Sequence, residues 1–201
     1  MARQMSFFSA EATTPRVADL AGLLCGHGRT IVFAKATARL SLAVDASWRA
    51  NALVRACAER GVAAEVKVCE EVGRPLLRTA FRSDLAPLAA AWTTGSAKSV
   101  PRGFGLDGAI LRMWVLAAGR WAEGSYLLPL DPEAPDTHEP LVAALTQCGL
   151  PAVMHSMGDE GPALRVTGRR RLGRLLELVG PPADQGCADQ WPAVSRMRVV
   201  S

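Results

Sequence analysis

The feature that most constrains this sequence is that its two halves repeat one order of structural signals. Residues 17–25 carry apolar side chains at helical spacing, and glycines at positions 26 and 28 end the predicted helix. A hairpin, a long amphipathic helix, a second hairpin and a short helix follow. From Asp107 onward the same order returns. Two such units fold most simply as one α+β molecule, with pseudo-twofold α-β-β-α-β-β-α repeats and antiparallel sheets.

The predicted elements occupy corresponding places in the two halves. In the first half we expect strands in TIVFAK (30–35), ARLSLAV (38–44), VAAEVKVCEE (62–71) and PLLRTAFR (75–82), with a turn at Ala36-Thr37 and a helix in WRANALVRACAER (48–60). In the second half we expect a helix in GAILRMWVLAAG (108–119), a helix ending near Gly149, a final helix over 169–180, and strands in RWAE (120–123), SYLLPL (125–130), LPAVMHSM (150–157) and PALRVT (162–167).

Glycine spacing supports the repeat. Gly28 and Gly119 are 91 positions apart (119 − 28), and Gly61 and Gly149 are 88 apart (149 − 61). The alternative is that any α+β chain can be divided into similar halves. The predicted organisation is a first repeat over 1–92, a linker over 93–105, a second repeat over 106–180 and a C-terminal arm over 181–201.

Composition and motif spacing favour a globular protein without a metal site. Of 201 residues, 49% are hydrophobic and 21% charged, so a packed core is expected, and the net charge of +4 permits attraction to polyanions without requiring it. No apolar run approaches the ~20 residues of a membrane span, and the N-terminus lacks an apolar signal region, so we expect a cytoplasmic protein that does not contact membranes. Metal-ligand spacing is absent among the cysteines and histidines, so we expect reduced thiols, no metal and no cofactor: Cys25, Cys57, Cys69, Cys148, Cys187, His27, His138 and His155.

Several stretches together resemble a known family. They are MSFFSAE, VADLAGLLCGHGRTIV, ARLSLAVDASWRANALVRA, AILRMWVLAAGRW, SYLLPL, LTQCGLPAVM and GRRRLGRLLELVG. The pattern resembles the LAGLIDADG fold of homing endonucleases, and within that fold the N-terminal portion of WhiA, a sporulation and cell-division regulator of Gram-positive bacteria. This sequence differs in having ATTPR where WhiA proteins carry a paired cysteine, and in opening its final helix with three arginines.

The resemblance implies a transcriptional regulator or scaffold of sporulation and cell-division genes. WhiA proteins continue into a C-terminal helix-turn-helix domain that supplies most of their DNA binding, and the sequence up to Ser201 lacks it. The resemblance therefore implies a partner in the transcription machinery, such as a sigma factor, and weak, salt-sensitive binding of duplex DNA at most.

The signature stretch LAGLLCGHG, residues 20–28, lacks the acidic residues that serve homing endonucleases as metal ligands. Cys25 and His27 stand at the two acidic positions, and Leu116 and Ala118 stand there in the second repeat. Since Mg²⁺ chemistry on phosphodiesters requires oxygen ligands, we expect a protein without enzymatic activity. The alternative is a residual metal-dependent DNA endonuclease that uses His27 as a general base.

What remains of the signature is a packing role for small residues. The resemblance predicts that the first signature helix packs against the second along the pseudo-twofold axis, so that replacing Gly22 by leucine destabilises the whole fold. The predicted contact involves Ala21, Gly22, Gly26, Ala109, Ala117 and Gly119.

Two groups of basic residues are candidates for DNA binding. The first group lies on predicted strands and turns, where about half can share one sheet face: Arg29, Lys35, Arg39, Lys67, Arg78, Arg82, Arg120 and Arg165. The acidic neighbours Glu65, Glu70, Glu71 and Glu123 dilute this charge. The second group opens the final helix, where the helix dipole disfavours cations: Arg169, Arg170, Arg171 and Arg174. Solvated surface charge is the alternative for both groups.

Two further patterns are weak. The stretch TTGSAKS (93–99) ends in Lys98-Ser99 like a phosphate-binding loop but lacks the glycines that such a loop needs. Tryptophans lie in apolar patterns and are predicted to anchor the core or an interface: Trp48, Trp92, Trp114, Trp121 and Trp191.

Overall fold

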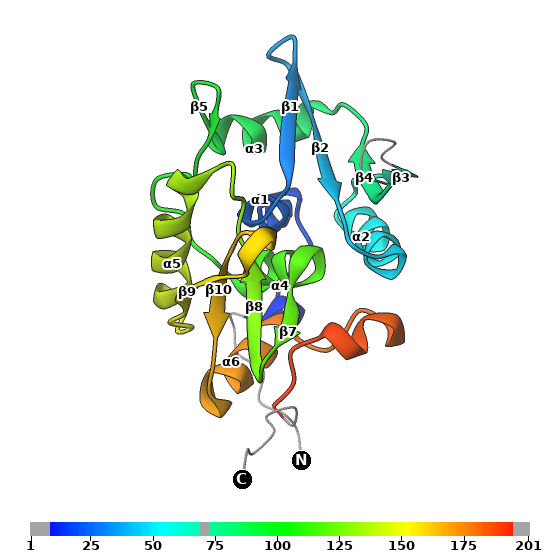
Figure 1. Cartoon of the computed structure of the whole chain (residues 1–201). Coiled ribbons are helices and arrows are strands. Elements are labelled where there is room, and N and C mark those ends of the chain that lie inside the picture. Colours follow the sequence, from blue (N-terminus) through cyan, green and yellow to red (C-terminus); the bar gives the residue numbers. More distant parts are fainter. Residues whose placement is uncertain (1–8, 69–72, 195–201) are drawn as a thin grey trace.

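The computed structural model describes residues 9–68 and 73–194 (Figure 1). The α-helices are α1 (Ala21–Cys25), α2 (Ser47–Glu59), α3 (Ala86–Ala91), α4 (Gly108–Ala118), α5 (His138–Gln147) and α6 (Arg169–Val179). The strands are β1 (Arg29–Phe33), β2 (Thr37–Ala43), β3 (Ala64–Val68), β4 (Pro75–Thr79), β5 (Thr93–Thr94), β6 (Ala97–Lys98), β7 (Arg120–Ala122), β8 (Ser125–Pro129), β9 (Val153–Ser156) and β10 (Pro162–Val166). Short 3₁₀ turns are η1 (Ala10–Ala12), η2 (Val17–Leu20), η3 (Ser83–Leu85), η4 (Pro135–Thr137), η5 (Gly158–Glu160) and η6 (Gln185–Gln190).

The two halves form equivalent sheets. The first has strand order β1-β2-β4-β3 and the second β7-β8-β10-β9, and every neighbouring pair is antiparallel. Each sheet carries helices of its own repeat, so the predicted α+β fold of two like repeats is confirmed.

The two signature helices lie at the centre of the molecule, between the sheets (Figure 1). All five residues of α1 are buried, and α4 packs against it. The predicted helix over 17–25 begins with a 3₁₀ turn, and its α-helical part begins at Ala21. The buried Asp19 carboxylate accepts a hydrogen bond from the Arg16 backbone N–H (2.9 Å) and from Arg60 Nε (3.1 Å), which holds this first turn in place.

The first hairpin turns earlier than the sequence pattern indicates. The predicted turn at Ala36-Thr37 is correct for Ala36 only, because the turn covers residues 34–36 and β2 already begins at Thr37. Ala34 and Lys35 adopt left-handed backbone conformations (φ 50° and 56°), and the Ala36 N–H donates to the Phe33 carbonyl (3.2 Å). Such a turn matches the twist of the strands, but it normally carries glycine or asparagine, so these residue types conceal it.

The segments outside the repeats also pack onto the fold. Residues 93–98, within the predicted linker, form the β5–β6 hairpin. In the predicted C-terminal arm, Trp191 is buried and donates to the Gly180 carbonyl (2.8 Å), while Trp121 and Tyr126 donate to the carbonyls of Trp191 and Gln190 (both 2.9 Å). Within residues 9–68 and 73–194, no helix has the length and apolar character needed to cross a membrane.

Candidate nucleic-acid interface and signature-helix centre

The signature helices touch backbone to backbone at Gly22. A Cβ atom added there would lie 2.6 Å from the Met113 Cβ and 2.8 Å from the Trp114 nitrogen, and it would overlap the Ile110 carbonyl oxygen. No side chain larger than hydrogen fits this approach. The structure thus places Gly22 in the predicted contact, and the neighbouring Ala21 is buried as well.

The other small residues of the predicted contact have different neighbours. Ala109 and Ala117 are buried in α4, and a Cβ on Gly26 would make ordinary contacts with the Pro129 carbonyl oxygen (3.4 Å) and the Trp114 ring (3.5 Å). Gly119 does not follow the prediction that it lies against the first signature helix. A Cβ there would overlap the Tyr126 hydroxyl and lie 2.8 Å from the Val115 carbonyl oxygen, so its nearest neighbours belong to its own repeat and not to α1.

The four residues at the family's acidic positions carry no carboxylate and differ in exposure. Cys25 and Leu116 are buried, Ala118 is partly buried and His27 is exposed. Burial raises the pKa of the Cys25 thiol far above its ordinary value, although the charge of Lys98 opposes this shift. The thiol therefore stays protonated and is a poor metal ligand. In the described part of the chain, no group of three His, Cys, Asp or Glu side chains is placed to hold a metal ion.

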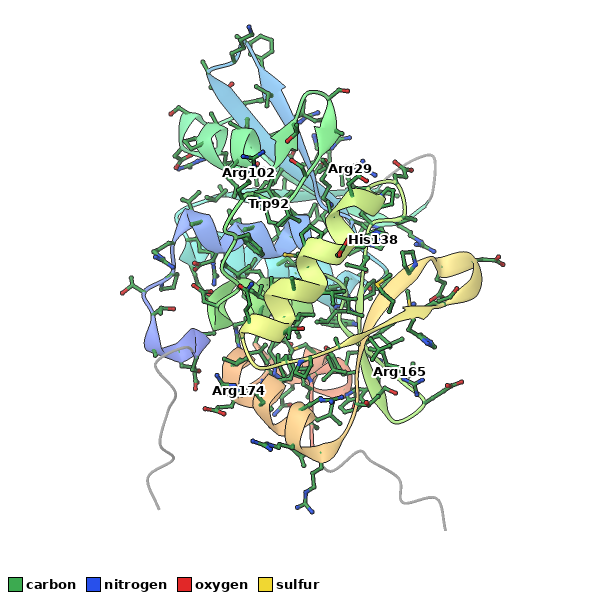
Figure 2. The ribbon with its side chains drawn as sticks, turned by 90° about the vertical axis from the view of Figure 1, so that its left-hand side faces the viewer. Arg29, Trp92, Arg102, His138, Arg165 and Arg174 are labelled. Carbon is green, nitrogen blue, oxygen red and sulfur yellow. The ribbon has the colours of Figure 1, made fainter. Side chains whose placement is uncertain are left out.

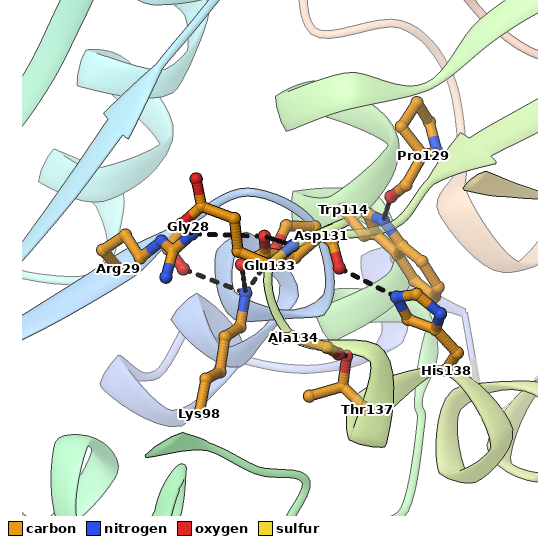
Figure 3. A network of polar contacts seen from close by, with 11 residues as sticks. Gly28, Arg29, Lys98, Trp114, Pro129, Asp131, Glu133, Ala134, Thr137 and His138 are labelled. Carbon is orange, nitrogen blue, oxygen red and sulfur yellow. Dashed lines mark hydrogen bonds and ion pairs between the residues drawn. The ribbon is translucent and has the colours of Figure 1, made fainter. Parts of the chain in front are cut away.

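A buried lysine closes the end of the first signature helix (Figure 3). Lys98 extends from β6, and its ammonium group donates to the carbonyls of Gly26 and Gly28, the latter at 3.0 Å. It also forms an ion pair with Asp131 (3.1 Å), whose side chain is only 1% exposed. Asp131 accepts a second hydrogen bond from Arg29 (3.2 Å), so two cations share this one buried carboxylate.

A buried arginine closes the end of the second signature helix. Arg49, on α2, is only 2% exposed and donates to the carbonyls of Leu116 (2.7 Å), Gly119 (3.2 Å) and Val115 (3.3 Å). Its Nε atom donates to Asp45 (2.8 Å). Because the carbonyl end of a helix is electrically negative, a cation is favourable there. Both signature helices therefore end on a cation supplied by the protein.

His27 lies within the electrostatic influence of the Lys98 site. Partial desolvation lowers its pKa from the ordinary value of 6.5, and the charges of Lys98, Arg29 and Arg120 lower it further, while Asp131 opposes them. The imidazole is thus neutral at pH 7. Since the folded state disfavours the protonated form, the contribution of His27 to stability is present above pH 6.5 and is lost as the pH falls through the folded-state pKa.

The influence of Lys98 on His27 can be measured by NMR titration of the imidazole. In the Lys98→Met variant one cation is gone while Asp131 remains, so the pKa of His27 is expected to rise towards or above its ordinary value. The matched control is Arg102→Met, which removes an exposed cation that does not contribute to the His27 shift. A His27 pKa that is the same in the Lys98→Met variant and the wild type would show that the ammonium group does not act on this histidine.

Strand register brings four of the candidate cations to one face of the first sheet. Arg29 and Arg78 both pair with Ser41, while Arg39 pairs with Ile31 and Lys67 with Leu76. Cross-strand partners point to the same side, and these positions alternate with the core residues Leu40, Leu42 and Leu77. We call this the open face of the first sheet.

The cations of the open face differ in whether they already have a partner. Arg29 is paired with Asp131 and Glu133, and Lys67 is paired with Glu65 (2.9 Å). Arg39 and Arg78 each have a buried Nε atom without a hydrogen-bond partner among the described residues. The Arg39 guanidinium lies 4.8 Å from the centre of the Phe81 ring, next to the exposed Phe33. Among the described residues, Arg39 and Arg78 are therefore the cations of this face without a carboxylate partner, and both side chains are partly exposed.

Other candidates are already engaged or lie elsewhere. Lys35 lies in the β1–β2 turn, and Arg82, which bridges to Ala38, forms an ion pair with Asp84. On the second sheet, Arg120 and Arg165 both flank Leu127, but Arg120 pairs with Glu160 and Arg165 donates to the Ser125 hydroxyl (2.7 Å). The four arginines at the start of α6 lie apart from these residues: Arg169, Arg170, Arg171 and Arg174. Cys69, Glu70, Glu71 and most of the MSFFSAE stretch lie outside the described residues.

Sequence reasoning missed Lys98, Asp131 and Arg49 as residues of the helix ends. Lys98 stood out only as a weak phosphate-loop signal, and no motif surrounds Asp131 or Arg49. Arg49 and Lys98 each reach the end of a signature helix from another element, and Asp131 pairs with Lys98 there, contacts that sequence spacing does not reveal.

Comparison with known proteins identifies the fold. No family model and no curated protein matches the sequence. Among solved structures, the homing endonuclease I-WcaI bound to its DNA recognition sequence is similar with a TM-score of 0.59, at 13% identity over 86% of this chain and 84% of that one. The N-terminal LAGLIDADG domain of DUF199/WhiA is similar with a TM-score of 0.55, at 12% identity over 94% and 98% of the two chains.

A third structure, "full-length DUF199/WhiA from Thermatoga maritima", has a TM-score of 0.56 at 13% identity. The alignment covers 90% of this chain but 58% of that protein, so this chain spans somewhat more than half of its length. These likenesses establish a LAGLIDADG homing-endonuclease-like fold.

Proposed function

We propose that this chain is a LAGLIDADG-fold module without nuclease activity, acting as a WhiA-like regulator or scaffold in transcription. The observation that carries the proposal is the buried cation at the end of each signature helix, Lys98 at the first and Arg49 at the second. The proposed setting is the cytoplasm, with sporulation and cell-division genes as targets and a transcription-machinery protein, such as a sigma factor, as partner.

The cations disfavour a divalent metal ion at the helix ends. Mg²⁺ requires several oxygen ligands, most often carboxylates and water. Asp131 is the buried carboxylate beside the first helix end, and Lys98 and Arg29 already neutralise it. A divalent ion there would face an ammonium group at close range in a desolvated setting, where repulsion between like charges is strong. The geometry thus supports binding without metal-dependent cleavage.

Duplex DNA is the proposed ligand of the open face. The I-WcaI structure of the same fold is bound to its DNA recognition sequence. On this chain, Arg39 and Arg78 are partly exposed and form no ion pair with a carboxylate among the described residues, which leaves their charges available for phosphate contacts. Because Arg29, Lys67 and Arg120 are already paired with carboxylates, few cations remain for DNA. Weak and salt-sensitive binding follows.

The affinity of the Arg39→Gln variant for a mixed-sequence duplex is expected to fall about tenfold at low salt, because a phosphate contact is lost. The slope of log affinity against log salt should become shallower by about one. Fluorescence anisotropy with a labelled duplex measures both quantities. The matched control, Arg102→Gln, removes an exposed arginine from the segment between β6 and α4, which belongs to neither sheet of the two repeats, and should change neither quantity.

The same preparations test the absence of nuclease activity. Duplex DNA libraries incubated with Mg²⁺ or Mn²⁺ should remain intact with the wild-type protein. Metal-dependent cleavage that is lost in the His27→Ala variant would overturn the proposal in favour of a residual endonuclease. Equal loss of affinity in the Arg39→Gln and Arg102→Gln variants would instead remove the open face as the DNA site.

A further inference from the structure

The start of α6 gathers cations without matching acids. Arg169, Arg170 and Arg171 are exposed, and no ion pair to them is found among the described residues. Arg174 is partly buried and pairs with Glu177 (3.0 Å). Together the four arginines line a hollow of about 820 Å³, with Gly149, Pro151, Thr167 and Gly168 as the other lining residues. The hollow therefore presents an excess of positive charge.

A second, apolar cavity adjoins this hollow. It has a volume of about 230 Å³ and lies between α5, α6 and the segment before α4. Its lining consists of Gly105, Leu106, Ala144, Gln147, Cys148, Arg174 and Leu178. Arg174 lines both spaces, so a charged hollow and an apolar cavity lie side by side at this residue. We call the two together the α6 groove.

The charge of the groove is costly unless an anion is bound. Cations at the N-terminal end of a helix oppose the positive end of its dipole. Gly168, which precedes α6, has no side chain that could accept hydrogen bonds from the first turn. Carboxylates placed among Arg169, Arg170 and Arg171 would satisfy both the guanidinium groups and the helix end. The adjoining cavity would at the same time accommodate one apolar side chain.

The groove lies away from the proposed DNA surface. In Figure 2, Arg174 lies at the lower left, whereas Arg29 and Arg165 lie on the right-hand side. A duplex on the open face would leave the groove accessible. The apolar cavity also separates the two classes of ligand, because a DNA backbone has no apolar side chain to insert there. The combination of acid and apolar anchor fits a peptide segment better than a nucleic acid.

We propose that the α6 groove binds an acidic peptide segment of a partner protein, with carboxylates against Arg169, Arg170 and Arg171 and one apolar anchor side chain in the cavity beside Leu106 and Leu178. The inference rests on the partner-binding part of the proposed function and is independent of the DNA-binding part. It assigns a location and a chemistry to that partner contact.

The test uses the full chain and a fluorescein-labelled synthetic peptide in which a single leucine is flanked on both sides by glutamates. Affinity is measured by fluorescence anisotropy. The Arg170→Glu and Arg171→Glu variants are expected to bind about tenfold more weakly, because each change replaces attraction by repulsion. Arg102→Glu makes the same charge change on an exposed residue that lines neither the hollow nor the cavity, and it should leave the affinity unchanged. Replacing the peptide's leucine by alanine should weaken binding by about fivefold, from the loss of buried apolar area.

The outcomes separate the inference from the DNA proposal. The Arg39→Gln variant should retain full peptide affinity while losing DNA affinity. The peptide measurement therefore tests the groove, and the DNA measurement tests the open face, independently of each other. Equal losses of peptide affinity in the Arg170→Glu and Arg102→Glu variants would show that the peptide responds only to the net charge of the protein. This result would overturn the proposal that the α6 groove is the peptide site. Equal affinities of the leucine and alanine peptides would show that no apolar side chain of the peptide occupies the cavity. Competition by duplex DNA that depends on Arg170 would assign the groove to nucleic acid instead.

Discussion

Replacing Gly22 by alanine is expected to lower the free energy of unfolding by about 3 kcal/mol or more, at the upper end of the usual cost of overpacking. The added methyl group would meet the Ile110 carbonyl and the Trp114 nitrogen, which are backbone atoms that cannot rotate away. Relief requires α1 and α4 to separate, and with them the two halves of the core. Urea unfolding followed by circular dichroism measures the effect.

Gly26 provides the matched control within the same signature. A Cβ added to Gly26 would make ordinary contacts of 3.4 and 3.5 Å and would overlap no backbone atom. Gly26→Ala is therefore expected to destabilise the protein clearly less than Gly22→Ala, because no helix has to move to make room for it. Alanine also favours a helix over glycine by about 1 kcal/mol, so a loss at Gly22 must come from the helix contact. Equal stability of the Gly22→Ala variant and the wild type would contradict the close approach at this residue.

The two-repeat organisation could be predicted because it depends on signals between residues that are close together in the sequence. Apolar spacing, the glycines that end helices and the alternation of strands act over a few residues, and each returns in the second half. The four cations of the open face follow from the same alternation, once the pairing of β2 with β4 fixes the register. That pairing joins strands more than thirty residues apart, so the sequence pattern alone left open which cations share a face.

The helix ends were not predictable in the same way. Arg49 lies at the start of an amphipathic helix, where an arginine is ordinarily a solvated residue, yet its side chain is buried against the end of α4. Lys98 lies in a two-residue strand that the sequence pattern did not predict. Glu160 also forms an ion pair with Arg120 across the second sheet. Arg120, a predicted DNA-binding cation, therefore already has a carboxylate partner. Charge partners of this kind depend on tertiary distances rather than on spacing along the chain.

The two buried cations give a common explanation for the altered signature. The carbonyl groups at the buried end of a helix need hydrogen-bond donors, and leaving them without partners is costly. Lys98 supplies donors to the carbonyls after α1, and Arg49 supplies them to the carbonyls at the end of α4. The central packing of the fold is thereby retained without the groups that bind a metal.

Replacing Arg49 by methionine is therefore expected to lower the free energy of unfolding by about 3–5 kcal/mol, the usual cost of removing one partner from a buried charged network. Methionine fills much of the space but leaves the carbonyls of Val115, Leu116 and Gly119 without their donor. The contact of the guanidinium with the Trp48 ring, 4.6 Å from its centre, is lost as well. Thermal and urea unfolding measure the change.

Arg55→Met is the matched control, because it makes the same substitution on the same helix. Arg55 is 55% exposed and pairs with the partly exposed Asp184, so its loss should cost less than about 1 kcal/mol. Arg49→Lys retains the charge but donates from a single nitrogen, and its stability should lie between those of the wild type and Arg49→Met. Equal destabilisation by Arg49→Met and Arg55→Met would show that the end of α4 does not depend on the Arg49 cation. This cation would then not explain how the second signature helix ends without a carboxylate.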